Sequence, residues 1–382
     1  MSGSSRTPSW RSSPLRSRTE LAALLLLALV SCAPAVVVQA QGDALTPVPT
    51  RDKKIARRWV LPGDPRGVAV GNDGTIYVGL AEPQSVIAVD AMTGAVKKRI
   101  VLDSAEIAST KELVAMRTNL ERTLLYIANG SDESATILSL PDLDVVREIT
   151  MEGEAIRDIV PDPKGRYVYV LGRRVHVFDK DGDVELRTLP IDEPMAIAAS
   201  ANGTMLAVLA TEDFGNTKAT VVALFDTTNF AELARDPLQT EKTIESAMFA
   251  ARDRSLIAFS RDALFEKPVN ARPVRITAGG DGKGAMRVDI GDLVNSNHVC
   301  LPNGSGPQIA ALTSSDTQLV YAERRCSASG TFSGSDRGIT PASLYGVNAY
   351  AIAYDRKSNA IVATDRAGFL TIYNIPRPAV SK

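Results

Sequence analysis

The sequence predicts an all-β protein built from repeated four-stranded units, and three observations support this fold class. The stretch from Arg66 to Ile100 reads as four short apolar strands separated by tight turns. Weaker copies of this stretch recur through most of the remaining chain. The last copy lacks a fourth strand, while an apolar stretch suited to that role, Ala56 to Leu61, lies directly before the first copy.

The first unit shows the strand and turn signals most clearly. The four-residue turn Gly71 to Gly74 (GNDG) consists of residues that tolerate the left-handed backbone of tight hairpins. Asp90 begins a later turn of the same unit, and Asp179 and Asp226 recur at equivalent places. Because an aspartate repeated at a turn position stabilises the turn, we interpret all three as turn formers rather than ligands. The four strands of this unit are Gly67 to Val70, Thr75 to Leu80, Ser85 to Asp90 and Ala95 to Leu102.

The spacing of the units predicts the architecture. Consecutive units begin 39 to 63 residues apart, which is typical of propeller blades with insertions. The sequence therefore predicts a seven-bladed β-propeller of four-stranded blades, closed by the N-terminal strand Ala56 to Leu61, because a closed ring leaves only short, protected edges. Its fourth unit contains a loop from Thr211 to Lys218. The unit starts are Gly67, Leu113, Arg157, Ala196, Ser246, Ile309 and Ala351.

The first forty residues predict export. Arginines precede an apolar run from Leu21 to Val30, as in a secretory signal. Three outcomes stay open: lipidation of Cys32 after a lipobox-like sequence, ordinary cleavage before Gln41, or an uncleaved anchor from Leu21 to Val38. We thus divide the chain into a signal segment (1–40), a linker (41–52) and a propeller (53–378), and expect a periplasmic or cell-surface protein, lipid-anchored through Cys32.

The chain contains three cysteines. If Cys32 carries lipid, Cys300 and Cys326 remain as an even pair in an oxidising compartment, where a disulfide persists. The alternative is two unpaired thiols.

Composition limits the partners. A formal charge of −1 and an apolar fraction of 45% are ordinary for a soluble globular protein. The basic triplet Lys97 to Arg99 suits a solvated outer strand, so we expect no nucleic-acid partner.

Short motifs carry a family resemblance over the whole body of the chain. The segments YVGL (Tyr77 to Leu80) and YIAN (Tyr126 to Asn129), with the strand endings VIAVD, VHVFD and VALFD, resemble the YVTN-type repeat of secreted bacterial proteins and of lactonase-like seven-bladed propellers. There is no WD dipeptide, which disfavours a WD40 identity. The resemblance implies the fold and an exported location, but many unrelated activities use this scaffold.

The resemblance also implies that the residue before each first strand faces a central funnel. Arg66, Glu112, Glu245, Gln308 and Tyr350 are the candidate binding residues among these positions. Two carboxylates and one amide are few ligands for a metal, so we predict no metal site and no cofactor. The seven positions hold Arg66, Glu112, Ile156, Met195, Glu245, Gln308 and Tyr350.

Signals for catalysis are weak. The chain has only two histidines, His176 and His298, and no G-x-S-x-G motif beside either. The segment Asp179 to Asp183 lacks the spacing of a calcium loop, and the glycine-rich Gly279 to Gly284 favours a hairpin turn over a phosphate loop. Catalytic residues stay unknown. We therefore expect a non-catalytic module that binds a protein or envelope partner, with a small molecule as another ligand class. The alternative is a lactonase-like hydrolase using the funnel.

Overall fold

The structure is a computed structural model of the chain. The described residues are 37–38, 43–53, 55–81, 84–102, 115–129, 133–200, 202–215, 217–238, 244–249, 255–260, 272–277, 287–292, 298–300, 309–312, 318–322, 341–346, 349–355, 357–358, 360–365 and 367–374. Among them, only the backbone is described at 37–38, 214, 217 and 354, and at every described position from 236 to 350 except Ala247.

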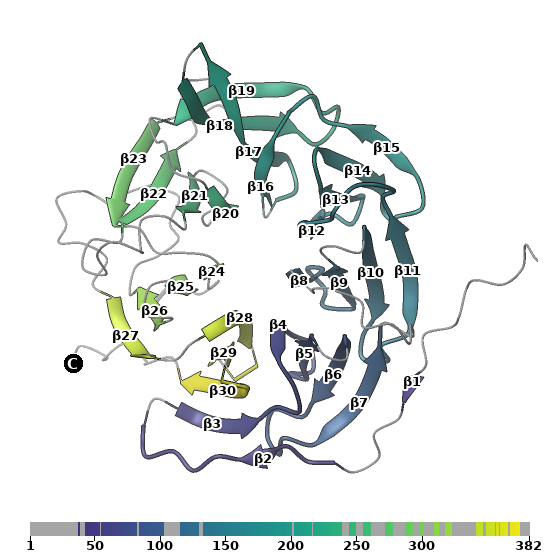
Figure 1. Ribbon diagram of the computed structural model, residues 1–382, viewed down its shortest axis with the longest axis vertical. Helices are drawn as coiled ribbons and strands as arrows, with labels where there is room; N and C mark the ends of the chain where they lie inside the picture. The colour runs from purple at the N-terminus through teal and green to yellow at the C-terminus, as the bar shows by residue number, and fades with distance from the viewer. Residues whose placement is uncertain are drawn as a thin grey trace, which may run out of the picture. The chain divides into compact units, whose positions relative to one another are not determined.

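The strands in these ranges form seven antiparallel sheets, and the same ranges contain no helix (Figure 1). The first sheet contains β1 (Val37–Val38), β7 (Val96–Val101), β6 (Ser85–Val89), β5 (Ile76–Leu80) and β4 (Pro65–Val70). The second contains β11 (Val145–Thr150), β10 (Ser134–Ser139), β9 (Leu124–Ala128) and β8 (Ala115–Thr118). The third contains β12 (Asp158–Pro161), β13 (Tyr167–Leu171), β14 (Val175–Asp179) and β15 (Glu185–Thr188).

The remaining sheets continue this pattern. The fourth contains β16 (Pro194–Ala199), β17 (Met205–Phe214), β18 (Thr217–Asp226) and β19 (Glu232–Leu238). The fifth contains β20 (Ile244–Phe249), β21 (Ser255–Ser260), β22 (Arg272–Thr277) and β23 (Arg287–Asp292). The sixth contains β24 (His298–Cys300), β25 (Ile309–Leu312), β26 (Gln318–Ala322) and β27 (Pro341–Gly346). The last contains β2 (Thr46–Pro47), β3 (Ile55–Val60), β30 (Phe369–Asn374), β29 (Ala360–Asp365) and β28 (Ala349–Asp355).

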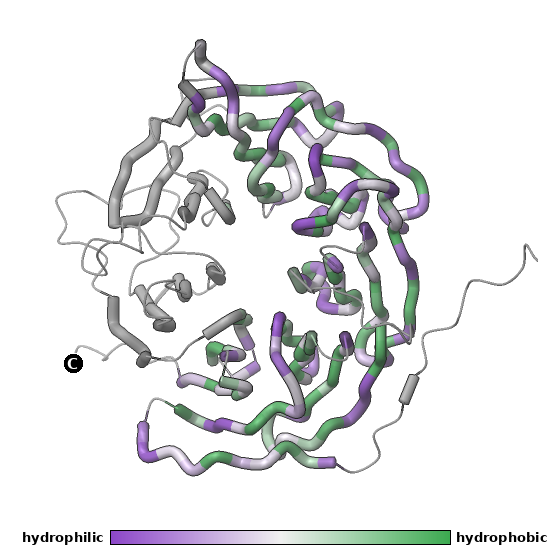
Figure 2. The backbone as a smooth tube through the Cα atoms, viewed as in Figure 1, coloured by the Kyte–Doolittle hydropathy of each residue, from purple (hydrophilic) through white to green (hydrophobic). Residues whose placement is uncertain are grey.

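The first strands of neighbouring sheets contact one another. β4 contacts both β8 and β28, β12 contacts β8 and β16, and β16 contacts β20. This packing buries both faces of the sheets, so the strands read as nearly continuous apolar runs rather than as an alternating pattern. Figure 2 shows apolar colour on the inner strands of the second, third and fourth sheets, interrupted by polar residues. The result is an all-β, propeller-like fold.

Two details differ from the sequence analysis. The predicted loop from Thr211 to Lys218 is a long hairpin instead, with Phe214 opposite Thr217 at its tip. Ile309 to Leu312, the predicted first strand of the sixth unit, is the second strand of its sheet, because His298–Cys300 precedes it and pairs with it as the first strand.

The predicted linker is partly folded against the body. Thr46 and Pro47 pair with Val60 and Trp59 of β3, while the Leu45 amide donates to the Gly94 carbonyl at 2.9 Å. Leu45 itself is buried in a core shared by the first and last sheets. Residues 43–48 therefore bridge these two sheets and are not a loose tether.

The strand Ile55–Val60 occupies the position that the sequence analysis gave to Ala56 to Leu61. It pairs antiparallel with Phe369–Asn374, the third strand of the last sheet. Arg58 of β3 forms an ion pair at 3.1 Å with the buried Asp365 of β29, and its guanidinium lies over the Phe369 ring of β30.

Candidate functional site

The first strands of four sheets begin with the same irregularity. The pairing register shifts by one residue at Arg66 in the first sheet, Met195 in the fourth, Glu245 in the fifth and Tyr350 in the last. A bulge of this kind gives the strand one extra residue and redirects its side chain. Four of the predicted funnel positions thus share one backbone geometry, although the side chains of Glu245 and Tyr350 are not described.

The predicted positions differ in their surroundings. Arg66, one of the four at a bulge, forms an ion pair with Asp64 at 2.8 Å. Ile156 is fully buried in the core, so the funnel prediction is wrong at this position. In the third sheet the continuous register begins only at Asp158, which pairs with Leu171, and Ile156 forms a separate bridge before it. Glu112 and Gln308 lie outside the described residues and stay predictions.

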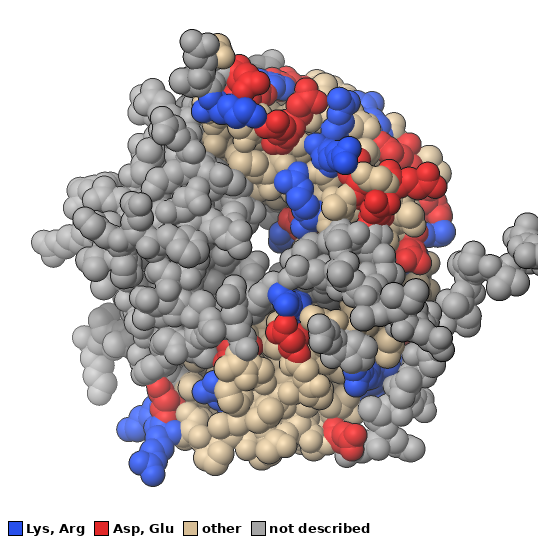
Figure 3. All heavy atoms as spheres, viewed as in Figure 1, with Lys and Arg blue, Asp and Glu red and all other residues tan. Residues whose placement is uncertain are grey.

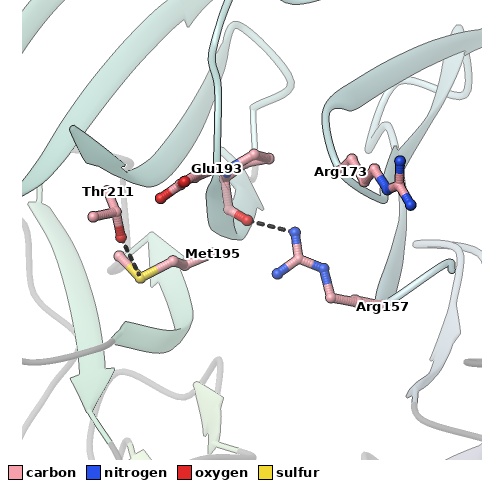
Figure 4. Close-up of a pocket in the computed structure, with 6 residues that line it drawn as sticks. Arg157, Arg173, Glu193, Met195 and Thr211 are labelled. Carbon is pink, nitrogen blue, oxygen red and sulfur yellow. Dashed lines mark hydrogen bonds between the residues drawn. The ribbon is translucent and has the colours of Figure 1, made fainter. Parts of the chain in front are cut away.

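A pocket opens where the third and fourth sheets meet. Its volume is about 480 Å³, within the usual range of ligand sites. Figure 4 shows the arginine side chains on one side of it and Met195 and Thr211 on the other. Met195 is the one predicted funnel position in this lining. The lining residues are Arg157, Arg173, Glu193, Pro194, Met195 and Thr211.

Arg157 is the most firmly held side chain of the pocket. Its guanidinium donates hydrogen bonds to the carbonyl of Gly172, beside the third sheet, and at 2.5 Å to the carbonyl of Pro194 in the fourth. Burial lowers the pKa of Arg157, and the nearby Glu154 carboxylate opposes this shift. Arginine nevertheless stays charged in proteins, so the pocket carries a fixed cation.

The acidic residue of the pocket is already paired. Glu193 has a left-handed backbone (φ 46°), and its carboxylate accepts from the Lys218 ammonium at 3.1 Å. On the same wall, the Thr211 hydroxyl donates to the Met195 sulfur at 3.4 Å. In the described part of the chain, no carboxylate forms an ion pair with Arg157 or Arg173. The pocket therefore combines a net positive charge with an apolar wall.

Behind the pocket, His176 is held by two carboxylates. Its Nδ1 lies 2.9 Å from Glu185 and its Nε2 lies 3.3 Å from Glu154. Glu154 also accepts from the Arg174 amide at 3.0 Å, and it packs so closely on Gly172 that a Cβ there would lie 2.3 Å from its Oε1. Both imidazole nitrogens are thus engaged, and we assign this cluster to support of the pocket wall rather than to base catalysis.

The described lining of the pocket does not supply the groups of a hydrolase. These residues include no serine, cysteine or histidine, and the one hydroxyl among them, on Thr211, is directed at a thioether. Across the described residues there is no group of three or more His, Cys, Asp or Glu side chains placed to hold a metal ion. The arrangement suits binding of an anionic group beside an apolar one.

The aspartate predictions are confirmed. The Asp90 carboxylate accepts from the Met92 and Thr93 amides at 2.9 and 3.0 Å. Asp179 accepts from the Asp183 amide at 2.8 Å. In the same way, Asp226 accepts from the Thr228 amide at 2.7 Å. These carboxylates stabilise turns, as predicted.

Several predictions concern residues whose side chains are not described. Cys32 and Cys326 lie outside the described residues, and only the backbone of Cys300 is described, in β24. Lipidation and the disulfide therefore stay predictions. No helix within the described ranges has the length and apolarity that a membrane crossing requires.

Comparison with solved structures supports the fold. The β-propeller domain of Myceliophteria thermophila Cps50 (Swd1) superposes with a TM-score of 0.63, at 13% identity, over 88% of this chain and 100% of that domain. A chain of the mitotic checkpoint complex superposes with a TM-score of 0.63, at 14% identity, over 90% of this chain and 99% of that one. The fold is propeller-like.

The family assignment is a separate question. No family model and no curated relative matches the sequence. The resemblance to YVTN-type and lactonase-like repeats therefore stays a prediction. At identities this low the structural likeness concerns the fold and not the activity.

Proposed function

We propose that the chain is an exported, seven-bladed β-propeller that binds a protein partner in the cell envelope and performs no catalysis. The observation that carries this proposal is the pocket beside Met195. Its cation, Arg157, is held in place by the backbone carbonyls of Gly172 and Pro194, and its described lining residues include no serine, cysteine or histidine. A rigid charged pocket of this kind favours recognition, because little side-chain entropy is lost on binding.

Ring closure by the N-terminal strand is part of this proposal. Supporting it are the seven sheets of the described strands, the pairing of β3 with β30, and the contact of β28 with β4. In this arrangement each sheet corresponds to one blade, and the first strands begin on a common face. The pocket lies at the starts of two such strands, so the partner binds this face.

The cellular address is a second part of the proposal. Cys32 follows Leu29-Val30-Ser31, so we propose lipidation of Cys32 and attachment to the envelope membrane. Replacing Cys32 by Ser, with Cys300→Ser as the control, tests this by fractionation. We expect only the Cys32 variant to leave the membrane fraction; unchanged fractionation contradicts lipidation. Mass spectrometry of the mature N-terminus distinguishes lipidated Cys32 from cleavage before Gln41.

Binding is tested by isolating the protein from envelope extracts after reversible cross-linking. We expect one partner in stoichiometric yield. We further expect Met195→Lys to lower this yield, because a second wall of the pocket becomes charged, while Val146→Lys on the outer strand β11 leaves it unchanged. Absence of any stoichiometric partner contradicts the proposal. No contact among the described side chains favours the lactonase-like alternative, and its glutamates Glu112 and Glu245 have no described side chain.

A further inference from the structure

The pocket between the third and fourth sheets presents two guanidinium groups, of Arg157 and Arg173, and neither forms an ion pair with a carboxylate among the described residues. Arg157 uses its Nη2 for the carbonyls of Gly172 and Pro194. A guanidinium has five N–H groups, and in the described part of the chain no acceptor contacts Nε or Nη1 of Arg157. Arg173 is exposed and lies on the same side of the pocket (Figure 4).

The neighbouring acids do not satisfy this charge. Glu193 lines the pocket but pairs at 3.1 Å with Lys218, which is not a lining residue. Glu154 directs its carboxylate to His176 and the Arg174 amide. Asp192, the remaining acid of this loop, pairs with Arg174 at 3.2 Å. Among the described residues, no carboxylate therefore competes with an incoming anion for Arg173.

We propose that this pocket binds a carboxylate of an acidic segment in the partner protein, an inference that rests on the proposed function. The planar guanidinium matches a carboxylate through two parallel hydrogen bonds. Arg157, already fixed by two carbonyls, sets the position of the carboxylate. Arg173 adds a second cation from the exposed side. Pro194 and Met195 pack against the apolar part of the segment.

The surroundings favour a protein segment over a nucleic acid. A polyanion needs an extended basic surface, whereas the chain has a net charge of −1. Figure 3 shows basic side chains beside the hollow at the centre of the view and acidic side chains scattered over the same sheets. A single carboxylate beside an apolar side chain fits a localised charge of this kind in a pocket of about 480 Å³.

Fluorescence anisotropy with three labelled peptides tests the inference on the protein purified from a host that exports it. The first peptide alternates Leu and Glu and has both ends blocked. The second replaces Glu by Gln, and the third is the Gln peptide with a free C-terminal carboxylate. We expect the first or the third to bind and the second not to bind. Which of the two binds identifies a side-chain or a chain-terminal carboxylate.

Charge reversal supplies the matched controls. Arg173→Glu is expected to lower the affinity for the bound peptide by at least about tenfold, since a charged hydrogen bond and an ion pair are replaced by repulsion. Arg174→Glu, one residue along and outside the pocket, is expected to change affinity by less than about twofold. Arg157→Gln tests the fixed cation, and Arg173→Glu keeps the test valid if that variant fails to fold.

Failure of the inference is distinguishable from failure of the proposed function. Equal binding of all three peptides, or an Arg173→Glu variant that binds like wild type, contradicts the carboxylate pocket. If the wild type binds no peptide but still isolates with a stoichiometric partner, the inference is wrong and the proposed function stands. If neither peptide nor partner binds, both are wrong.

Discussion

The indole of Trp59 packs directly on Gly94, across the line where the first and last sheets meet. A Cβ at Gly94 would lie 2.3 Å from the indole Nε1, and Trp59 is only 3% exposed. Trp59 belongs to β3, whereas Gly94 lies in the turn before β7. The contact therefore joins the last sheet, which contains β3, to the first sheet, which contains β7. It requires a residue without a side chain at position 94.

Replacing Gly94 by Ala is expected to lower the free energy of unfolding by about 2–5 kcal/mol. About 1–2 kcal/mol comes from placing an L-residue in the left-handed region and the rest from the clash with Trp59. Gly153→Ala is the matched control, because Gly153 has the same φ of 73° but no atom within 4 Å of the added Cβ. Denaturant titration measures both. Equal losses would show that the Trp59 contact contributes nothing.

Leu45→Ala is expected to cost about 2–3 kcal/mol, as for other buried leucines. Leu45 is 7% exposed and shares a core with Trp59 and Val96. Thr46→Ala, at the exposed neighbouring position, is expected to change stability by less than about 0.5 kcal/mol. Thermal unfolding compares the two. Equal stability of both variants and wild type would contradict the packing of residues 43–48 on the body.

Arg166→Lys is expected to cost about 1–3 kcal/mol although the charge is kept. The Arg166 guanidinium pairs with the fully buried Asp162 at 2.8 Å and also donates to Gly203 and Thr227, which joins the third and fourth sheets. A lysine cannot make this set of bonds, and the buried carboxylate loses donors. Arg174→Lys, in an exposed pair with Asp192, is the control and is expected to be neutral. Denaturant midpoints that match between the two variants would contradict this role.

The lowered pKa of Asp90 predicts that the free energy of unfolding decreases at acid pH. Partial burial would raise its pKa, but the amides of Met92 and Thr93 and the Lys97 ammonium outweigh this effect and hold the pKa at about 2. The unfolded value is about 3.9, so the stabilisation is present above that pH and is lost as the pH falls toward 2. We expect the stability difference between wild type and Asp90→Asn to shrink over this range. A difference that stays constant contradicts the assignment.

Much of the fold could be predicted because its signals are local. Turn aspartates such as Asp90 and Asp179 repeat at the same place, and apolar runs mark the buried strands. The strand β3, which pairs with the last unit, could be inferred from the same pattern, because that unit has only three strands of its own. The folded part of the predicted linker could not, because Leu45 lies in a short stretch without a periodic apolar pattern and its burial depends on sheets distant in sequence.

The candidate site was predicted less well because it depends on register. Met195 could be placed at a strand start, and the bulge there confirms the alignment. In the third sheet the continuous strand begins at Asp158, and the alignment selected Ile156, which is buried, instead of its neighbour Arg157, which lines the pocket. The carbonyls that hold Arg157 are backbone groups of Gly172 and Pro194, and no side-chain pattern reveals them.

Site-specific photo-cross-linking shows whether the partner binds at the pocket face. A photoreactive residue placed at Met195 is compared with one at Val146, which is 50% exposed on the outer strand β11. We expect one cross-linked partner from position 195, loss of that product on adding Arg173→Glu, and no such product from position 146. The same product from both positions, or none from position 195, would contradict binding at this face.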